Sequence, residues 1–417
     1  SSPAEWDFNP IWTKAEKAQI LTVANFTAHR SPERFIYRGL SLNSRHIDWH
    51  MFSEVSMRQY MKDEIRERLQ MIRDTAESAD GRCITPSHET LLHLAAGLGE
   101  VQLLNRLLQR HADPNVQIIL PQQAFPSIPD SEQGNTPLTY ACQPGMDDST
   151  PLPVHNRISC LNLLIQYGAD VNKPGPLGWP PLVITCVAGI GGAPYEEAAL
   201  FLLKCGADIS LQPELKGKKT SLLTWATAAG YPLLVRKLCE AGYDPNFRGE
   251  MVPPLLSLNL NTPNTALQIA HILLEYGADV NAAMPASTTL PETTGDTALL
   301  NLCRQLAFID VSQLPQIREL VSLFISEGAD VNHQNAAGET PLMACCRGML
   351  LGDDSLDRLK LGIARLLLDH RADPSLRDKY GRTALQRIGN RSNEHLQMVL
   401  KYLPELSAPP LPKKENR

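Results

Sequence analysis

Residues 264–281 read NTALQIAHILLEYGADVN, and this stretch is the clearest copy of a unit that the chain repeats. Its residues Ile269, Ile272, Leu273 and Tyr276 fall three or four positions apart, so they lie on one face of a short helix. Gly277 can adopt the left-handed conformation that ends a helix. The sequence Ala-Asp-Val-Asn that follows favours a turn.

The same ending occurs elsewhere in the chain with small changes. It reads HADPN at 111–115, GADVN at 168–172, GADIS at 206–210, GYDPN at 242–246, GADVN at 328–332 and RADPS at 371–375. A matching opening, Gly-x-Thr followed by Pro or Ala and then Leu, begins at Gly134, Gly295, Gly338 and Gly381. Each unit therefore reads as a turn, a short helix, a loop, a second helix and a turn. Successive units begin somewhat more than about thirty residues apart.

This pattern resembles the ankyrin repeat, and the resemblance covers roughly residues 89–403. One helix pair cannot bury its apolar stripe alone, so neighbouring pairs must stack and share a continuous core. We therefore expect an all-α ankyrin-repeat solenoid of about eight helix-pair units with β-turn connections and a helical N-terminal cap.

The expected domain organisation has three parts. Residues 1–85 do not repeat and are predicted to form a helical cap or extension, residues 86–403 form the repeat domain, and residues 404–417 form a proline-rich flexible tail. The predicted repeats lie near 89–115, 134–172, 178–210, 218–246, 252–281, 295–332, 338–375 and 381–403. An independent small domain in residues 1–85 is the less favoured alternative, because few apolar residues lie between its two helix-like segments.

Composition limits the classes of function. The net charge of -6 is spread over 39 basic and 45 acidic residues without a long run of either sign, which argues against nucleic acid as the main ligand. The nine cysteines are scattered without a Cys-x-x-Cys pair, which is typical of reduced core residues in an intracellular protein. The longest apolar run, residues 181–194, is too short to cross a bilayer. We expect a cytoplasmic or nuclear location.

Candidate catalytic and metal-binding residues are few. His46 and His50 lie one helical turn apart, but Ile47 occupies the position where a hydrolytic zinc motif has glutamate, so ordinary structural histidines are the favoured interpretation. The sequence has no Gly-x-Ser-x-Gly elbow, and its glycine-rich stretch 189–192 reads as a loop between helices. We therefore expect no cofactor, no metal and no enzymatic activity.

The resemblance implies a binding surface on the first helix of each unit. The residue after the family's histidine position points into the concave groove of such proteins. In this chain the corresponding residues are Leu94, Tyr140, Ile184, Trp225, Ser257, Asn301, Ala344 and Arg387. The first four are large and apolar, which predicts an apolar groove for a peptide or helix in repeats one to four.

The predicted partner-binding residues are six of this row together with one turn-tip residue, Trp179. They are Leu94, Tyr140, Trp179, Ile184, Trp225, Asn301 and Arg387. The structural alternative is that Trp225 packs against a neighbouring inner helix and that Trp179 lies on the loops inserted between the two helices of some repeats, at 143–157, 189–195, 305–316 and 348–359. The histidine of the family's opening, which ties neighbouring turns together, is kept only as His93.

Two further candidates are weaker. Asn172, Asn281 and Asn332 end Asp-Val-Asn turns that resemble the sites of asparagine hydroxylation in the ankyrin family. In the tail, Pro409, Pro412 and Lys414 resemble a ligand of SH3 domains, although a plain flexible linker is the favoured interpretation.

Together these patterns predict a non-catalytic scaffold or adaptor that binds a partner protein or peptide. The alternative is that the chain is the targeting or substrate-recognition arm of a larger multidomain enzyme, or that an activity resides in residues 1–85. The two readings differ in whether ionisable groups converge in the N-terminal region.

Overall fold

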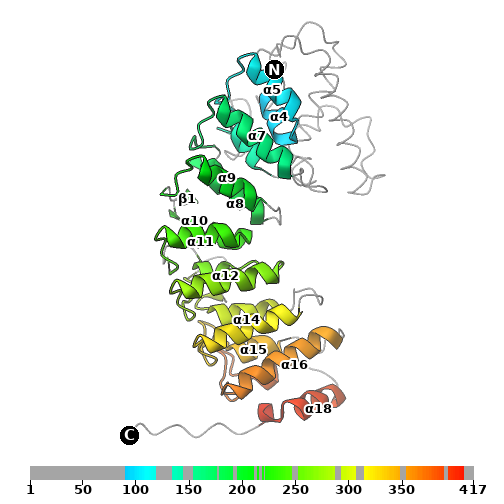
Figure 1. Cartoon of the computed structure of the whole chain (residues 1–417). Helices are drawn as coiled ribbons and strands as arrows, with labels where there is room; N and C mark the ends of the chain where they lie inside the picture. The colour runs from blue at the N-terminus through cyan, green and yellow to red at the C-terminus, as the bar shows by residue number, and fades with distance from the viewer. Residues whose placement is uncertain are drawn as a thin grey trace, which may run out of the picture. The chain divides into compact units, whose positions relative to one another are not determined.

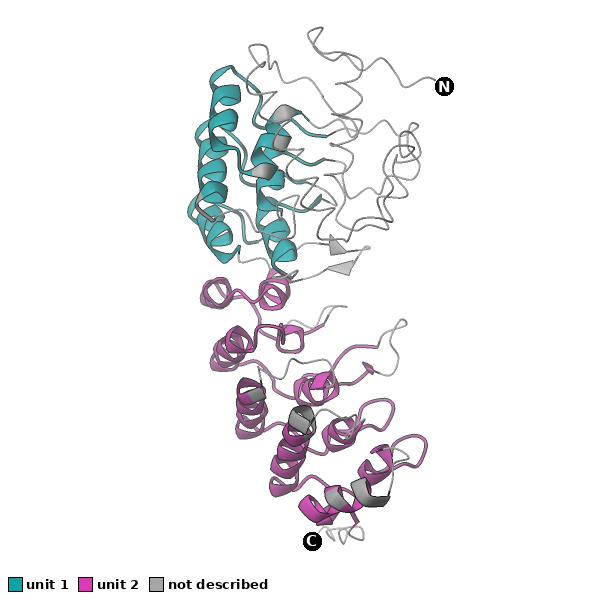
Figure 2. Ribbon diagram, turned by 90° about the vertical axis from the view of Figure 1, so that its right-hand side faces the viewer, with its two compact units in different colours: residues 1–217 teal, residues 218–417 magenta. Residues whose placement is uncertain are grey.

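A computed structural model of the chain describes most of the repeat region. The described residues are 90–118, 134–143, 154–175, 178–190, 195–210, 214–215, 218–219, 221–246, 252–286, 293–306, 314–347, 354–388 and 393–407. The chain forms two compact units, residues 1–217 and residues 218–417, which Figure 2 draws in different colours. The predicted N-terminal cap and proline-rich tail lie outside the described residues, apart from residues 404–407.

The first unit contains three helix pairs in its described part. They are α4 (Leu91–Leu98) with α5 (Val101–Gln109), α6 (Pro137–Cys142) with α7 (Val154–Gln166), and α8 (Pro181–Ile190) with α9 (Glu196–Lys204); the two-residue strand β1 (Glu214–Leu215) follows. The first helices, α4, α6 and α8, contact one another in order and form an inner row, and α5, α7 and α9 form an outer row (Figure 1).

The second unit repeats this two-row arrangement. Its elements are β2 (Lys218–Lys219), α10 (Leu222–Ala229), α11 (Pro232–Glu240), η5 (Pro254–Ser257), α12 (Pro263–Glu275), α13 (Ala298–Gln305), α14 (Leu314–Ser326), α15 (Pro341–Cys346), α16 (Asp354–Asp369), α17 (Ala384–Arg387), α18 (Asn393–Tyr402) and η9 (Pro404–Ser407). The inner row runs α10, η5, α13, α15, α17, and the outer row runs α11, α12, α14, α16. Helix pairs stacked in two rows confirm the predicted all-α solenoid class.

The threonine of the opening motif begins the inner helices. Thr136 and Thr340 each accept a hydrogen bond from the backbone N–H three residues later, at 3.1 and 3.2 Å. Proline occupies the first helical position after each, where the missing N–H costs nothing because that group has no partner within the helix. Thr-Pro-Leu is therefore a helix start signal that the chain uses repeatedly.

The fifth repeat departs from this plan in its inner row. The inner element is a single turn of 3-10 helix, η5, which begins at Pro254. Pro253 and Pro254 supply no backbone N–H and restrict the residues before them, so a longer α-helix is not supported here. Leu255 and Leu256 are nevertheless buried and keep the core continuous between α10 and α13.

The turns at the helix ends are joined by asparagine side chains. In the first unit, the Nδ2 atom of Asn115 donates to the carbonyl of Gly168 at 2.7 Å, and its Oδ1 accepts the N–H of Asp170 at 2.8 Å. Asn172 makes the same two bonds to Gly206 and Asp208. In the second unit the donors are Asn246, Asn281 and Asn332. This asparagine ladder satisfies helix-end carbonyls and links each turn to the next.

Candidate functional site

The predicted apolar row of the first unit is buried. Tyr140 is 6% exposed and Ile184 is 7% exposed, so the expectation that they form an open groove is wrong as regards their exposure. Glycines opposite them explain this: a Cβ added at Gly97 would lie 3.2 Å from Tyr140 Cδ1, and one added at Gly175 would lie 3.1 Å from Ile184 Cδ1. Both side chains therefore fill the space beside a glycine of a neighbouring element.

The other predicted residues lie in different environments. Trp179 is 9% exposed and its carbonyl accepts the N–H of Gly175 at 2.8 Å, so it is a buried turn residue and not a projecting anchor. The side chain of Leu94 lies outside the described part of the structure. Trp225 is half-buried, and Asn301 is half-buried with its Nδ2 3.4 Å from the carbonyl of Leu256.

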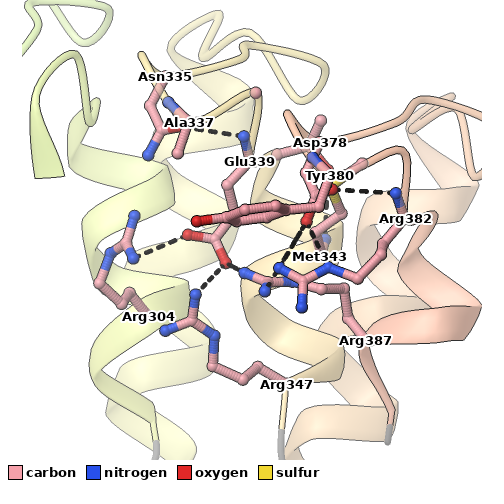
Figure 3. Close-up of polar contacts among 12 residues, drawn as sticks. Arg304, Asn335, Ala337, Glu339, Met343, Arg347, Asp378, Tyr380, Arg382 and Arg387 are labelled. Carbon is pink, nitrogen blue, oxygen red and sulfur yellow. Dashed lines mark hydrogen bonds and ion pairs between the residues drawn. The ribbon is translucent and has the colours of Figure 1, made fainter. Parts of the chain in front are cut away.

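Polar side chains from three neighbouring repeats converge on Glu339 in the second unit (Figure 3). The Nη1 atom of Arg304 lies 2.7 Å from Glu339 Oε2, and the Nη2 atom of Arg347 lies 2.7 Å from Oε1. Arg387 also pairs with Oε1. These arginines come from α13, the end of α15 and α17, so one buried carboxylate connects three successive inner helices.

Asp296 forms a second centre of this network. Arg304 donates to it through Nε and Nη2, each at 2.9 Å, and the Nδ2 of Asn335 donates at 2.7 Å. Burial raises the pKa of Asp296 and outweighs the hydrogen bonds from Arg304 and Asn335 that lower it. The bidentate arginine pair supplies both directionality and charge compensation inside the stack.

Asp378 is the third carboxylate. It accepts the backbone N–H groups of Tyr380 and Arg382 and the Nε of Arg382, each at 2.9 Å. Burial acts to raise the pKa of Asp378, but the backbone and side-chain hydrogen bonds from Arg382 outweigh it, so the pKa is lowered. The Nη1 of Arg387 lies 3.8 Å away and links this carboxylate to the Glu339 centre.

Two arginines of this network, Arg347 and Arg382, are partly exposed, whereas Arg304 and Arg387 are only 13% and 11% exposed. In the pair of Arg347 with Glu339 the arginine side chain is 50% exposed and the glutamate 1%. In the pair of Arg382 with Asp378 the values are 43% and 3%. The carboxylates are thus buried, and the guanidinium groups of Arg347 and Arg382 are the parts of these two ion pairs that contact solvent.

The carboxylates of the network are paired, and the thiols of the described residues, apart from that of Cys205, are buried. The three carboxylates are paired with arginines, and burial raises the pKa of Cys142 to about 11 and of Cys345 to about 12, so these thiols are protonated near neutral pH. Within the described residues no cluster of three His, Cys, Asp or Glu side chains has the geometry to bind a metal ion. No helix in this part of the chain has the length and apolar character needed to cross a bilayer.

Comparison with known proteins gives the family. The Ankyrin repeat family model matches residues 87–118, 133–175 and 337–379. The chain therefore contains ankyrin repeats in these three regions. Among curated relatives, Protein phosphatase 1 regulatory subunit 27 of Homo sapiens is 39% identical over 51 residues, which is 12% of this chain and 30% of that protein.

Longer and weaker matches lie in other ankyrin-repeat proteins. YahD of Escherichia coli (strain K12) is 28% identical over 199 residues, covering 48% of this chain and 85% of the relative. FPV031 of Fowlpox virus (strain NVSL) is 28% identical over 177 residues, covering 42% of this chain and 44% of the relative. The chain therefore spans less than half the length of the phosphatase subunit and of the viral protein.

The ion-pair network around Glu339 was not predicted, although the spacing of its residues in the sequence indicates it. Asp296 and Glu339 occupy the variable position of the Gly-x-Thr opening, and Arg304 and Arg347 follow them after eight residues. Asn135 occupies the same position in the second repeat and accepts a hydrogen bond from a glutamine eight residues later, at 2.9 Å. A polar residue in the opening and a partner eight positions on is thus a recurrent pairing.

The asparagines predicted to be hydroxylated belong to the ladder. Asn172, Asn281 and Asn332 each use the side-chain amide to join two turns of neighbouring ankyrin repeats. Their hydroxylation stays a prediction. The candidate SH3 ligand at Pro409, Pro412 and Lys414 and the histidines His46 and His50 lie outside the described residues.

Proposed function

We propose that this ankyrin-repeat protein is a non-catalytic adaptor that binds a partner protein or peptide on the inner row of its second unit. The observation that carries the proposal is a set of partly exposed inner-row side chains held in place by their neighbours. Trp225 is half-buried on α10. The Nδ2 of Asn301 donates to the carbonyl of Leu256, and its Oδ1 accepts a hydrogen bond from the Nε2 of Gln305 at 3.0 Å. Aromatic groups and preorganised polar groups are the usual anchors of protein interfaces.

The relatives support a role in protein recognition. The name of the phosphatase relative describes a regulatory subunit of a protein phosphatase. This favours a second candidate function, in which the chain recognises a target on behalf of an enzyme that it accompanies. The scattered cysteines favour a reducing compartment, so we assign the adaptor to the cytoplasm or nucleus as part of the same proposal.

The test compares two double variants of the second unit. Trp225→Ala with Asn301→Ala changes the inner row, and Leu233→Ala with Asn264→Ala removes an exposed apolar group and an exposed asparagine from the outer helices α11 and α12. Proteins that associate with the wild-type chain in cells are quantified by affinity capture and mass spectrometry for each variant. We expect the inner-row variant to lose its specific partners by about tenfold or more.

The control variant should retain these partners, and thermal unfolding should show that both variants are folded. If the inner-row variant keeps the full set of partners, or if both variants lose them equally, the inner row of the second unit is not the binding surface.

A further inference from the structure

A cationic face lies beside the buried carboxylates of the second unit. We define it by Arg347, Arg377, Lys379 and Arg382, all of which have exposed or partly exposed side chains, together with Tyr380. The carboxylates paired with Arg347 and Arg382 are 1% and 3% exposed. Because the negative ends of these pairs are internal, the face shows solvent mainly positive charge, in a chain whose net charge is -6.

Ion pairs on the outer row have a different balance. Arg236 and Glu275 on α11 and α12 are 41% and 60% exposed, and Arg365 and Glu405 are 39% and 42% exposed. There the acidic partner is at least as accessible as the arginine, so each pair is close to neutral from outside. The cationic face therefore differs from these two pairs, in which the acidic partner is also exposed.

Tyr380 gives the cationic face an aromatic centre. It is 68% exposed, and its ring lies 4.7 Å from the guanidinium carbon of Arg382 and 5.1 Å from the Nζ atom of Lys379. Its backbone N–H donates to Asp378, which fixes the turn that carries it. An exposed tyrosine flanked by cations combines an apolar contact surface with charge.

The arginines of the face are oriented before any ligand arrives. Arg382 uses Nε and Nη2 for Asp378, and Arg347 uses Nη2 for Glu339. A guanidinium group carries five N–H donors, so each of these side chains keeps donors for a further carboxylate. Because the buried acids already hold the guanidinium groups in place, ligand binding orders these side chains less and loses less conformational entropy.

We propose that the cationic face binds an acidic segment of a partner protein, in which Asp or Glu side chains pair with Arg347, Lys379 and Arg382 and an adjacent apolar or aromatic side chain packs on Tyr380. This inference rests on the proposed protein-binding function and names the chemistry of the partner. A short acidic segment contacts only this face. A nucleic acid carries a longer run of negative charge and would also meet the net negative charge of the chain.

The experiment measures fluorescence anisotropy of a labelled synthetic peptide, in which Asp and Glu flank a single Phe, on titration with the full chain. A peptide with Asn and Gln in place of the acids, a peptide with Lys in their place and a labelled single-stranded DNA of equal charge are titrated in parallel. We expect the acidic peptide to bind most tightly and its affinity to weaken as salt concentration rises.

Matched variants locate the binding. Arg347→Gln with Lys379→Gln should weaken binding of the acidic peptide by about tenfold, and Tyr380→Ala should weaken it by about threefold or more. The control is Arg236→Gln with Lys237→Gln, which removes one arginine and one lysine from the outer helix α11. It should bind as the wild type does. Thermal unfolding establishes that all variants are folded.

Three outcomes would overturn the inference: equal affinity for the acidic and the Asn/Gln peptides, tighter binding of the DNA than of the acidic peptide, or equal losses in the cationic-face and outer-helix variants. If the acidic peptide fails to bind while Trp225 and Asn301 remain necessary for partner capture, only this inference fails. If the peptide binds but the Trp225 and Asn301 variant keeps its cellular partners, only the inner-row assignment fails.

Discussion

Asn281 and Asp330 join two turns of neighbouring repeats: the Oδ1 atom of Asn281 accepts the backbone N–H of Asp330 at 2.8 Å, while its Nδ2 donates to the carbonyl of Gly328 at 3.0 Å. One side chain therefore satisfies a donor and an acceptor that the helix end and the turn leave open. The same pairing recurs along both units, so the asparagine ladder contributes to the stacking of each pair on the next.

Asn281→Ala should lower the free energy of unfolding of the second unit by about 1–2 kcal/mol, because it removes two hydrogen bonds at a partly solvated site. The measurement is equilibrium unfolding in urea. Asn264→Ala, at an exposed helical position, is the control and should change stability by less than about 0.5 kcal/mol. Equal effects of the two substitutions would show that the ladder does not support the stack.

Arg371→Gly should stabilise the protein by about 0.5–1 kcal/mol. Arg371 has a φ of 69° at a position where five other repeats have glycine and the first has His111. This left-handed conformation costs a residue with a side chain about 1–2 kcal/mol, partly offset by the greater freedom of glycine in the unfolded chain. Gly328→Ala is the reciprocal change, since Gly328 has a φ of 87° and open space around its Cβ position. It should destabilise by about 1 kcal/mol. A thermal shift of the same sign in both variants would contradict the backbone explanation.

Glu339→Gln should destabilise the second unit by about 3 kcal/mol or more, because it leaves Arg304, Arg347 and Arg387 around a neutral group in a buried setting. Urea unfolding measures the change. Glu275→Gln, which breaks the exposed pair with Arg236, should cost at most about 0.5 kcal/mol. If Glu339→Gln proves as mild as Glu275→Gln, the arginines do not depend on the carboxylate for their compensation.

His93 should make the first unit acid-sensitive. It is buried beside Tyr140, its Nε2 is 3.0 Å from the carbonyl of Asn135, and burial lowers its pKa from 6.5 to about 4 despite the backbone hydrogen bonds that raise it. The unfolded chain therefore binds a proton that the folded chain excludes as pH falls below 6.5. This contribution is fully present above pH 6.5 and is lost progressively toward pH 4.

The expected loss from this one group is up to about 3 kcal/mol. It is measured as the pH dependence of urea unfolding between pH 7 and the acid limit of the folded state, by a probe local to the first unit such as hydrogen exchange. His93→Gln has no imidazole to titrate and should have a flatter profile across this range. Identical slopes for the wild type and the variant would exclude His93 as the source.

The repeated local signals were sufficient to predict the helices of the stack. The stretch 264–281 predicted a helix that ends at Gly277, and α12 runs from Pro263 to Glu275 with Gly277 at a φ of 88°. Local signals work here because helix periodicity, threonine caps and left-handed glycines act within a few residues. The short inner element of the fifth repeat also has a local cause, because Pro253 and Pro254 do not support a longer α-helix.

The sequence was sufficient to predict the repeating helix pair and the Asp-x-Asn turns that end it. The accessibility of the side chains depends on how the repeats stack. Tyr140 is buried because Gly97 of the preceding repeat leaves room for it, and Ile184 is buried beside Gly175 of the turn before its helix. Glu339 is surrounded by arginines from three inner helices that stacking brings together. Exposure and ion pairing depend on which residues of neighbouring repeats face a side chain after stacking. The sequence of a single repeat does not specify these contacts.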